Sequence, residues 1–251
     1  MTTPSDGVYL RQMELGPMQN FVYLVGDPET RECVAVDPAW EIDAILEQVR
    51  ADGMHLTGAL VTHTHQDHVG GHLFGHDIPG IEDLLAKAPT KVYVHAAERE
   101  FLRGFGSDLV KVGGGDTLDV GRMKITFVHT PGHTPGSQCF LVDGRLISGD
   151  TLFIRSCGRT DLPGSDPREM YTSLTQRLGA LPDDTVVFPG FDGGAEWGGP
   201  AVDPDTGIMY VNANDLAWTG ALAPNTGENS ARGIYLSQCG VCHGSALEPG
   251  Q

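Results

Sequence analysis

Three histidines and one aspartate crowd together a quarter of the way along the chain: His63, His65, Asp67 and His68. Neutral imidazoles and carboxylates are ligand types that suit Zn(II), Fe(II) and Mn(II). The group follows Leu56 to Thr62, an apolar run with the length of a buried strand. We therefore expect a loop at a strand end that presents metal ligands, since reactive groups favour such loops. The alternative is a solvated histidine cluster.

Two later motifs offer the same ligand types in the same setting. His133 follows the predicted strand Lys124 to His129, within the turn-forming run Thr130-Pro131-Gly132-His133-Thr134-Pro135-Gly136. Asp150 follows Gly149 at the end of the predicted hairpin Gln138 to Ser148. Each motif repeats the order of apolar strand, small residue and ligand. We therefore expect the three strand ends to converge on a shared metal site.

Strands and helices alternate along the first three-quarters of the chain. Further strands are predicted over Asn20 to Val25, Cys33 to Asp37, Lys91 to Val94 and Thr185 to Phe188. Helices are predicted over Glu41 to Asp52, Ala96 to Arg103 and Arg168 to Leu178. Gly71 to Pro89 is predicted to be a long loop beside the pocket. Two sheet halves with helices on their outer faces predict a layered α/β sandwich.

The composition changes near Pro189, which marks a domain boundary. Residues 1–190 are expected to form the catalytic domain, and residues 191–251 an irregular tail rather than an independent domain. Within the tail, only Gly207 to Ala213 is predicted as a strand. Cys239-Gly240-Val241-Cys242-His243 fits the c-type haem attachment pattern. Haem is nevertheless not expected, because no Met or His follows His243 to serve as a distal ligand.

The charge and the ends of the chain narrow the range of partners and locations. The formal net charge is -17, which disfavours nucleic acid and anionic membranes as partners. A small-molecule substrate is expected, and the oligomeric state is left open. The first residues contain no apolar run typical of a secretory signal, and the five cysteines are mostly dispersed. A cytoplasmic location without disulfides is therefore predicted.

Together, His63-x-His65-x-Asp67-His68, Pro131-Gly132-His133-Thr134-Pro135-Gly136 and Gly149-Asp150 resemble the metallo-β-lactamase superfamily. The resemblance runs from about Val8 to Gly190. It implies an αββα sandwich with its metals at one edge. It further implies that His63, His65 and His133 hold a first metal and that Asp67 and His68 belong to a second, with Asp150 between them. Zinc is expected, as one or two ions, with iron or manganese as alternatives.

One position departs from the pattern of the dinuclear hydrolases in that family. Those enzymes carry a further metal-binding His after the Pro-Gly pair that ends the last core strand, whereas this chain reads Pro189-Gly190-Phe191. A phenylalanine has no lone pair to offer a metal. Asp192 is the nearest candidate replacement, although a residue in a glycine-rich loop is more often solvated. The resemblance therefore leaves the second metal position one ligand short.

The segment 150–166 resembles two branches of the family, the glyoxalase II-like hydrolases and the persulfide dioxygenases. The turn Leu162-Pro163-Gly164 favours the hydrolases, which implies attack of a metal-bound hydroxide on a thioester or ester such as an acylated glutathione, with Asp67 and Asp150 as catalytic residues. The first alternative is a mononuclear Fe(II) persulfide dioxygenase, whose ligands would correspond to His63, His133 and Asp150. The second is a metal-binding protein with a damaged, weakly active site.

Two smaller features carry alternatives of their own. Arg159 either binds a substrate carboxylate or braces its loop through Asp161 or Asp166, and the bracing role is favoured. The segments 193–199 and 209–214 resemble the end of a quinoprotein dehydrogenase propeller. The tail therefore reads as a foreign piece joined at Pro189-Gly190.

Overall fold

The computed structural model describes residues 7–73, 75–98, 106–153 and 156–191, and the backbone of two short paired strands, β14 (Ala201–Val202) and β15 (Met209–Tyr210). Strand β15 lies within the predicted strand Gly207 to Ala213. The haem-attachment pattern and Asp192 lie outside the described residues. Within the described residues, no helix is long and apolar enough to cross a lipid bilayer.

Two β-sheets form the centre of the structure. The first has six strands, in the order β1 (Tyr9–Leu15), β2 (Asn20–Asp27), β3 (Glu32–Val36), β4 (His55–Leu60), β7 (Lys91–His95) and β8 (Leu109–Val112). The second has five, in the order β13 (Val186–Pro189), β12 (Arg145–Gly149), β11 (Gln138–Val142), β10 (Met123–His129) and β9 (Thr117–Val120).

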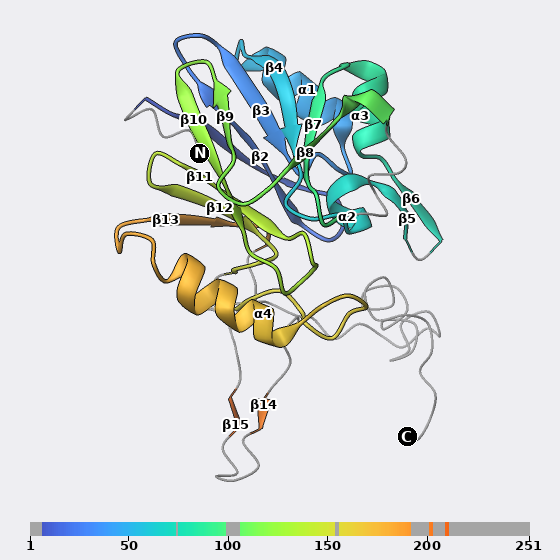
Figure 1. Cartoon of the computed structure of the whole chain (residues 1–251). Helices are drawn as coiled ribbons and strands as arrows, with labels where there is room; N and C mark the ends of the chain where they lie inside the picture. The colour runs from blue at the N-terminus through green and yellow to red at the C-terminus, as the bar shows by residue number, and fades with distance from the viewer. Residues whose placement is uncertain are drawn as a thin grey trace, which may run out of the picture.

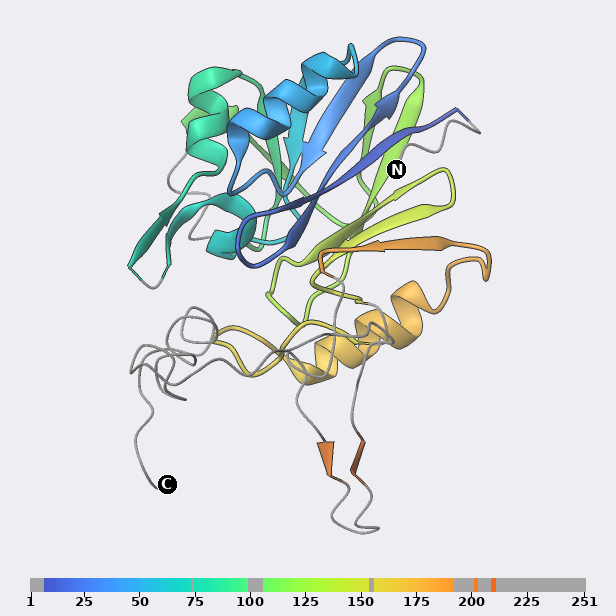
Figure 2. The ribbon, with the colours of Figure 1, turned by 180° about the vertical axis from the view of Figure 1, so that it is seen from behind.

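Helices lie on the two outer sides of this pair of sheets. Helices α1 (Ile42–Ala51) and α3 (Ile81–Lys87) pack on the first sheet. Helix α4 (Pro167–Thr172) continues into a π-helical segment (Ser173–Leu178) that packs on the second sheet. Figures 1 and 2 show α4 on the far side of the sheets from α1 and α3. The predicted αββα sandwich is therefore confirmed.

The alternation of side chains along β2 explains how both faces of the first sheet are covered. Val22 and Leu24 point into the cluster beneath α1 and α3, whereas Phe21, Tyr23 and Val25 point into the cluster between the two sheets. Successive side chains of a strand face opposite sides, so a strand buried on both faces must be apolar throughout. Burying each large apolar side chain contributes roughly 1.5–3 kcal/mol.

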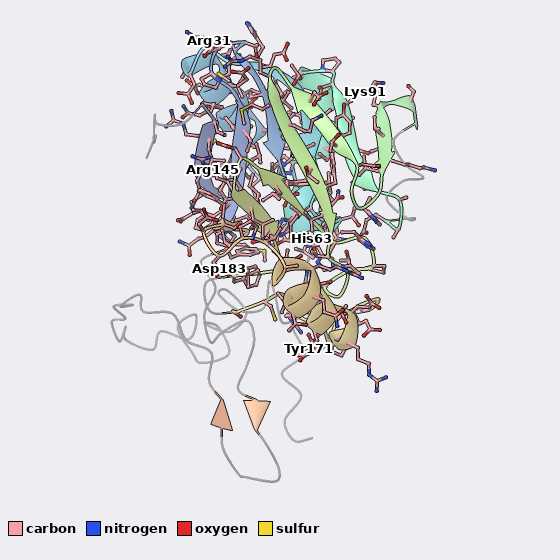
Figure 3. All side chains as sticks on the ribbon, turned by 60° about the vertical axis from the view of Figure 1, so that its left-hand side comes forward. Arg31, His63, Lys91, Arg145, Tyr171 and Asp183 are labelled. Carbon is pink, nitrogen blue, oxygen red and sulfur yellow. The ribbon has the colours of Figure 1, made fainter. Side chains whose placement is uncertain are left out.

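Strand direction brings the ends of several strands to one edge. β3, β4 and β7 run parallel in the first sheet. In the second sheet, β10 and β12 are both antiparallel to β11, and β13 is parallel to β12. The two sheets are tied at this edge by hydrogen bonds from Gln138 N to Thr62 O, 2.9 Å, and from Phe21 N to Gly190 O, 2.8 Å. Figure 3 shows His63 at this end, with Arg31 and Lys91 at the other.

The described elements differ from the sequence predictions in three places. The predicted loop Gly71 to Pro89 is wrong, because it contains the hairpin β5 (Gly71–Leu73) and β6 (His76–Ile78) and helix α3, whose buried Ile81 and Leu84 pack on the first sheet. The predicted helix Ala96 to Arg103 begins as a turn through Glu98, and the rest lies outside the described residues. Strands β1, β8 and β9 were not predicted, since their buried positions are few.

Replacing Phe127 by alanine tests the importance of the packing between the sheets. Its side chain is 1 % exposed, and its ring meets that of Phe140 edge to face, with centroids 5.4 Å apart. The Phe127→Ala variant should lose about 3–5 kcal/mol of unfolding free energy, measured by urea denaturation. Tyr171, 68 % exposed on α4, is the matched control. Tyr171→Ala should change stability by less than about 0.5 kcal/mol, and equal losses in both variants would contradict this assignment of the core.

Candidate metal centre

The histidine-rich segment follows the end of β4 directly. His63 lies just beyond that strand and is 1 % exposed. His65 caps the single-turn helix α2 (Gln66–Val69), which carries Asp67 and His68. The short helix turns the chain sharply, so that side chains from four of six consecutive residues can face one region. The predicted loop at a strand end is therefore present, with one helical turn inside it.

Glycines place the other two ligand candidates at the same edge. Gly132, before His133, has φ of +143°, and a Cβ there would lie 2.5 Å from the backbone of Met170. Gly149, before Asp150, has φ of +46°, and a Cβ there would lie 2.5 Å from Thr62 Oγ1. Any side chain at either position would push the loop away from its neighbour. The small residue before each ligand is thus required by close approach.

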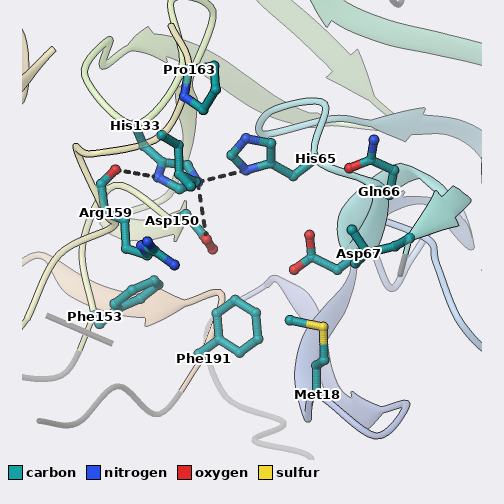
Figure 4. Close-up of a pocket in the computed structure, with 12 residues that line it drawn as sticks. Met18, His65, Gln66, Asp67, His133, Asp150, Phe153, Arg159, Pro163 and Phe191 are labelled. Carbon is teal, nitrogen blue, oxygen red and sulfur yellow. Dashed lines mark hydrogen bonds and ion pairs between the residues drawn. The ribbon is translucent and has the colours of Figure 1, made fainter. Parts of the chain in front are cut away.

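The structure brings three imidazoles and one carboxylate together. His65 Nδ1 lies 3.1 Å from His63 Nε2 and 2.9 Å from His133 Nε2. Asp150 Oδ2 lies 3.4 Å from His133 Nε2 and 4.0 Å from His63 Nε2. Figure 4 shows His65, His133 and Asp150 facing one another from separate loops. The three strand ends therefore converge as predicted, whereas the metal that they were predicted to share stays a prediction.

The partners of the outer ring nitrogens determine which nitrogen carries the proton. His133 Nδ1 lies 2.8 Å from the carbonyl oxygen of Arg159, which can only accept, so Nδ1 is the donor. The hydroxyl of Thr62 donates to Asp37 Oδ2 and therefore accepts from His63 Nδ1, 3.1 Å away. In the neutral rings, both Nε2 atoms are left with a lone pair directed at the shared centre.

This arrangement fits a bound cation. The lone pairs of His63 and His133 both face His65 Nδ1, which has at most one proton to offer them. Asp150 Oδ2 is a further acceptor at this centre, 3.4 Å from His133 Nε2. Ligand nitrogens at about 2.0–2.1 Å from a tetrahedral zinc lie about 3.3 Å apart, close to the spacings found here. A metal ion would satisfy all of these acceptors.

The protonation of two of these rings suits the same role. Burial holds the pKa of His63 well below its ordinary value, and the neighbouring ring of His68 adds to the effect. Burial, followed by the ring of His133, lowers the pKa of His65 to about 4. Both rings are therefore neutral near pH 7, and a neutral imidazole is the form that binds a metal.

Asp67 and His68 form a second group beside the first. His68 Nε2 lies 3.2 Å from Asp67 Oδ2 and 3.3 Å from Asp150 Oδ1. On its other side, His68 Nδ1 donates to Asp37 Oδ2 over 2.9 Å. Asp37 has φ of +51°, in the left-handed region that Asp tolerates better than most residues, and this directs its carboxylate at Thr62 and His68. The His68 ring is thereby fixed.

Opposite charges face each other within this second group. Burial alone would raise the pKa of Asp67, but the His68 ring and the Asn20 amide outweigh it and hold that pKa below its ordinary value. Burial likewise opposes protonation of His68, yet Asp67 and Asp150 hold the pKa of His68 well above its ordinary value. In the absence of a metal, the group is therefore an imidazolium paired with carboxylates.

Phe191 closes the side of the second group where a further ligand would be needed. Its side chain is 6 % exposed, and its ring meets the rings of His68 and Phe153 nearly at right angles, with both centroid distances 5.7 Å. Among the described residues, the second group contains one imidazole and two carboxylates, with an apolar ring beside them. These residues fit a second metal less well than the first group fits one.

A pocket of about 220 Å³ opens onto the centre (Figure 4). Four ligand candidates, Gln66, Arg159 and several apolar side chains form its wall. The ligand candidates are His65, Asp67, His133 and Asp150, and the apolar side chains are Met18, Leu73, Phe153, Leu162, Pro163 and Phe191. The Arg159 guanidinium is paired with both oxygens of Asp161, at 2.9 and 2.8 Å. The ion pair expected of the bracing role is therefore present, and the Arg159 carbonyl also accepts from His133 Nδ1, whereas substrate binding by Arg159 stays a prediction.

Other residues near the centre have modest roles. His72, 66 % exposed, pairs with Asp77, and His129 Nε2 lies 2.9 Å from the carbonyl oxygen of Pro135 in the His133 loop. Burial raises the pKa of the Cys157 thiol, as expected of a packed residue rather than a nucleophile. Cys33, Cys139 and Cys157, the described cysteines, are free thiols.

Two residues that orient the centre were missed by the sequence analysis. Asp37 follows strand β3 in the same order of apolar strand and polar residue that marked the other loops, so a signal existed. Asn20 is the first residue of β2, and no pattern in the sequence marks it as part of the site. Its Oδ1 accepts from the Trp40 indole over 3.1 Å, which directs its Nδ2 to Asp67 Oδ2, 3.0 Å away. Such a contact arises only from the packing of distant segments.

Comparison with known proteins identifies relatives in two branches. The chain is 33 % identical to the mitochondrial persulfide dioxygenase ETHE1 of Homo sapiens, over 74 % of this chain and 68 % of that protein. It is 38 % identical to the hydroxyacylglutathione hydrolase of Pseudomonas fluorescens, over 67 % of this chain and 60 % of that enzyme. The crystal structure of ETHE1 from Myxococcus xanthus superposes with a TM-score of 0.64 at 32 % identity, covering 73 % of this chain and 76 % of that one.

A family model described as the β-propeller domain of glucose/ethanol/alcohol dehydrogenase matches residues 144–239, less than half of the chain. It ends where the haem-attachment pattern begins and gives that pattern no support. That residues 191–251 form no independent domain stays a prediction. The model of the metallo-β-lactamase superfamily matches residues 15–190, which include strands β2 to β13 and the ligand candidates from His63 to Asp150. The chain belongs to the metallo-β-lactamase superfamily, a superfamily of metallo-hydrolases.

Proposed function

We propose that the protein is a metal-dependent hydrolase of thioesters or esters, with one divalent ion held by His63, His65, His133 and Asp150. The observation that carries the proposal is the shared centre at which the lone pairs of His63 and His133 meet without enough protons to satisfy them. The similarity to a hydroxyacylglutathione hydrolase supports an acylated thiol such as acylglutathione as the substrate class. We propose zinc as the metal, with iron and manganese as alternatives.

The residues around this centre have separable tasks. When bound, a divalent ion supplies a Lewis acid and lowers the pKa of a coordinated water to about 7. Asp67 lines the pocket, and its low pKa keeps it ionised, so it can accept a hydrogen bond from the attacking water. Asn20 holds Asp67 in place over 3.0 Å. The carboxylates Asp67 and Asp150 are therefore the proposed catalytic residues.

The apolar wall of the pocket has a different task. Phe153, Leu162 and Phe191 line the pocket together with the ligand candidates. Apolar walls exclude bulk water and strengthen the electrostatic interactions at the centre. They also fit the apolar part of an acyl group. We therefore propose that the acyl side of the substrate packs on this wall.

Phe191 favours a second candidate function, a mononuclear Fe(II) persulfide dioxygenase. A dioxygenase needs one iron with open positions, and a 2-His-1-carboxylate set suits it. His63, His133 and Asp150 would supply that set without help from the position of Phe191. The similarity to the dioxygenases of Homo sapiens and Myxococcus xanthus supports this alternative. A weakly active metal-binding protein is a further alternative, marked by stoichiometric metal without turnover.

The first prediction separates these functions. The zinc-loaded protein should release thiol from an acylglutathione, followed with a thiol-reactive dye, whereas the Fe(II)-loaded protein should not consume oxygen with glutathione persulfide. His133→Ala should lose bound zinc and thiol release, because it removes one of the converging lone pairs. His72→Ala, a change at an exposed histidine, is the control and should retain both. Oxygen uptake by the Fe(II)-loaded protein, together with no thiol release by the zinc-loaded protein, would contradict the hydrolase and support the dioxygenase.

The second prediction concerns the number of metal ions. The wild-type protein should bind one zinc per chain, measured by plasma mass spectrometry after gel filtration, because the second group lacks an imidazole at the position of Phe191. Phe191→His should raise this number to two by adding a ligand beside His68. Phe191→Leu should stay at one, since it changes the shape without adding a lone pair. Two ions in the wild type, or one in Phe191→His, would show that the second group is assigned incorrectly.

A further inference from the structure

Glu98 is a buried carboxylate beside the metal centre that the proposed mechanism does not use. It lies just beyond the end of β7 and is 8 % exposed. A turn closed by a hydrogen bond from its own backbone N–H to His95 O, 3.0 Å, fixes its backbone to the first sheet. Buried carboxylates are rare because desolvation is costly unless every oxygen is well bonded. The hydrogen-bond donors to the Glu98 carboxylate therefore indicate what the residue does.

In the described residues, all hydrogen-bonding partners of the Glu98 carboxylate belong to the two loops that carry the histidines. Glu98 Oε2 accepts from Thr64 Oγ1 over 2.5 Å, and Thr64 stands between His63 and His65. Glu98 Oε1 accepts from Thr134 Oγ1 over 2.5 Å and from Gly136 N over 2.9 Å. Thr134 follows His133 directly. One carboxylate thus joins the histidine loop of the first sheet to that of the second.

The loop that follows His133 is attached to Glu98 as a preformed unit. Thr134 N donates to Ser137 Oγ over 3.0 Å, so the loop after His133 is closed on itself. The approach to Glu98 is close, because a Cβ on Gly136 would lie 2.6 Å from Glu98 Oε1. Charge-assisted hydrogen bonds are shorter and stronger than neutral ones. Within the separation fixed by the core, Glu98 therefore ties the two loops directly to each other.

We propose that Glu98 is a positioning residue, which sets the distance of His63 and His65 from His133 and so tunes the affinity for the metal. The inference rests on the proposed metal site. His63 and His65 come from the first sheet and His133 from the second, so their nitrogens depend on how the loops are joined. Residues that orient metal ligands typically contribute about 10–100-fold in metal affinity. Glu98 acts through Thr64 and Thr134 and touches no ligand candidate itself.

The test is the zinc dissociation constant of the full-length chain, measured by competition with a chelating dye well below the unfolding temperature. Glu98→Ala should weaken zinc binding by about 10–100-fold, because it releases both loops. Glu98→Gln should bind nearly as tightly as the wild type. Its amide oxygen can accept from Thr134 and Gly136, and its NH₂ can donate to Thr64. Rescue by this variant separates tethering from negative charge.

Two further variants exclude a general loss of stability. Phe127→Leu weakens packing between the sheets away from Glu98 and should lower the melting temperature without changing the zinc affinity. Thr64→Val removes one of the tethering bonds and should weaken binding. Its effect should be absent in the Glu98→Ala background, because both changes break the same bond. Should Glu98→Ala fail to fold, Thr64→Val and Glu98→Gln carry the comparison.

The outcomes distinguish this inference from the function on which it rests. A wild-type chain that binds no stoichiometric zinc, iron or manganese overturns the proposed function. A wild-type chain that binds zinc, together with a folded Glu98→Ala variant of unchanged affinity, overturns only the positioning role. Equal losses in Glu98→Gln and Glu98→Ala would assign the effect to charge and would also overturn the tether.

Discussion

Hydrogen-bond donors are too few where His63, His65 and His133 meet, and this shortage is the constraint on which the remaining structure depends. The carbonyl of Arg159 and the hydroxyl of Thr62 each accept a hydrogen bond from the N–H of an outer ring nitrogen. The inner nitrogens are then left as buried acceptors. Unpaired buried polar atoms are costly, so such a cluster persists most readily with a cation at its centre. The loops that carry the ligand candidates, their glycines, and residues such as Asp37 and Asn20 that hydrogen-bond to the candidates hold the side chains in this otherwise unfavourable arrangement.

The two-sheet architecture supplies the rigidity that this arrangement needs. Parallel strands deliver Asp37, His63 and Glu98 to one edge of the first sheet, while β10, β12 and β13 deliver His133, Asp150 and Phe191 to the same edge. The site is therefore divided between two sheets whose separation is set by the packed core. Interior packing is dense and resists deformation. The packing of the two sheets therefore positions the candidate ligands, and Phe191 affects only the second group, beside His68.

The sequence predicted which histidines and carboxylates converge, because the motifs that carry them follow apolar strands and contain small or turn-forming residues, a pattern that is local in the sequence. The alternation of apolar strands and amphipathic helices predicted a layered α/β sandwich, and the family resemblance implied its αββα order. Prediction failed where the signal is not local. Asn20 reaches Asp67 across 47 positions, and Glu98 falls in a segment predicted as helix, yet its role depends on two loops from different sheets. The absence of a histidine at Phe191 was visible, whereas the packing of its ring against His68 required the structure.

The most direct measurement is an anomalous difference map from crystals grown with zinc and recorded on both sides of the zinc absorption edge. The account predicts one strong peak about 2.0–2.1 Å from His63 Nε2, His65 Nδ1 and His133 Nε2, with Asp150 next to it. It predicts none of equal height between His68 and Phe191. A map without a peak among the three histidines, or rings turned away from one another in saturating zinc, would contradict the central claim.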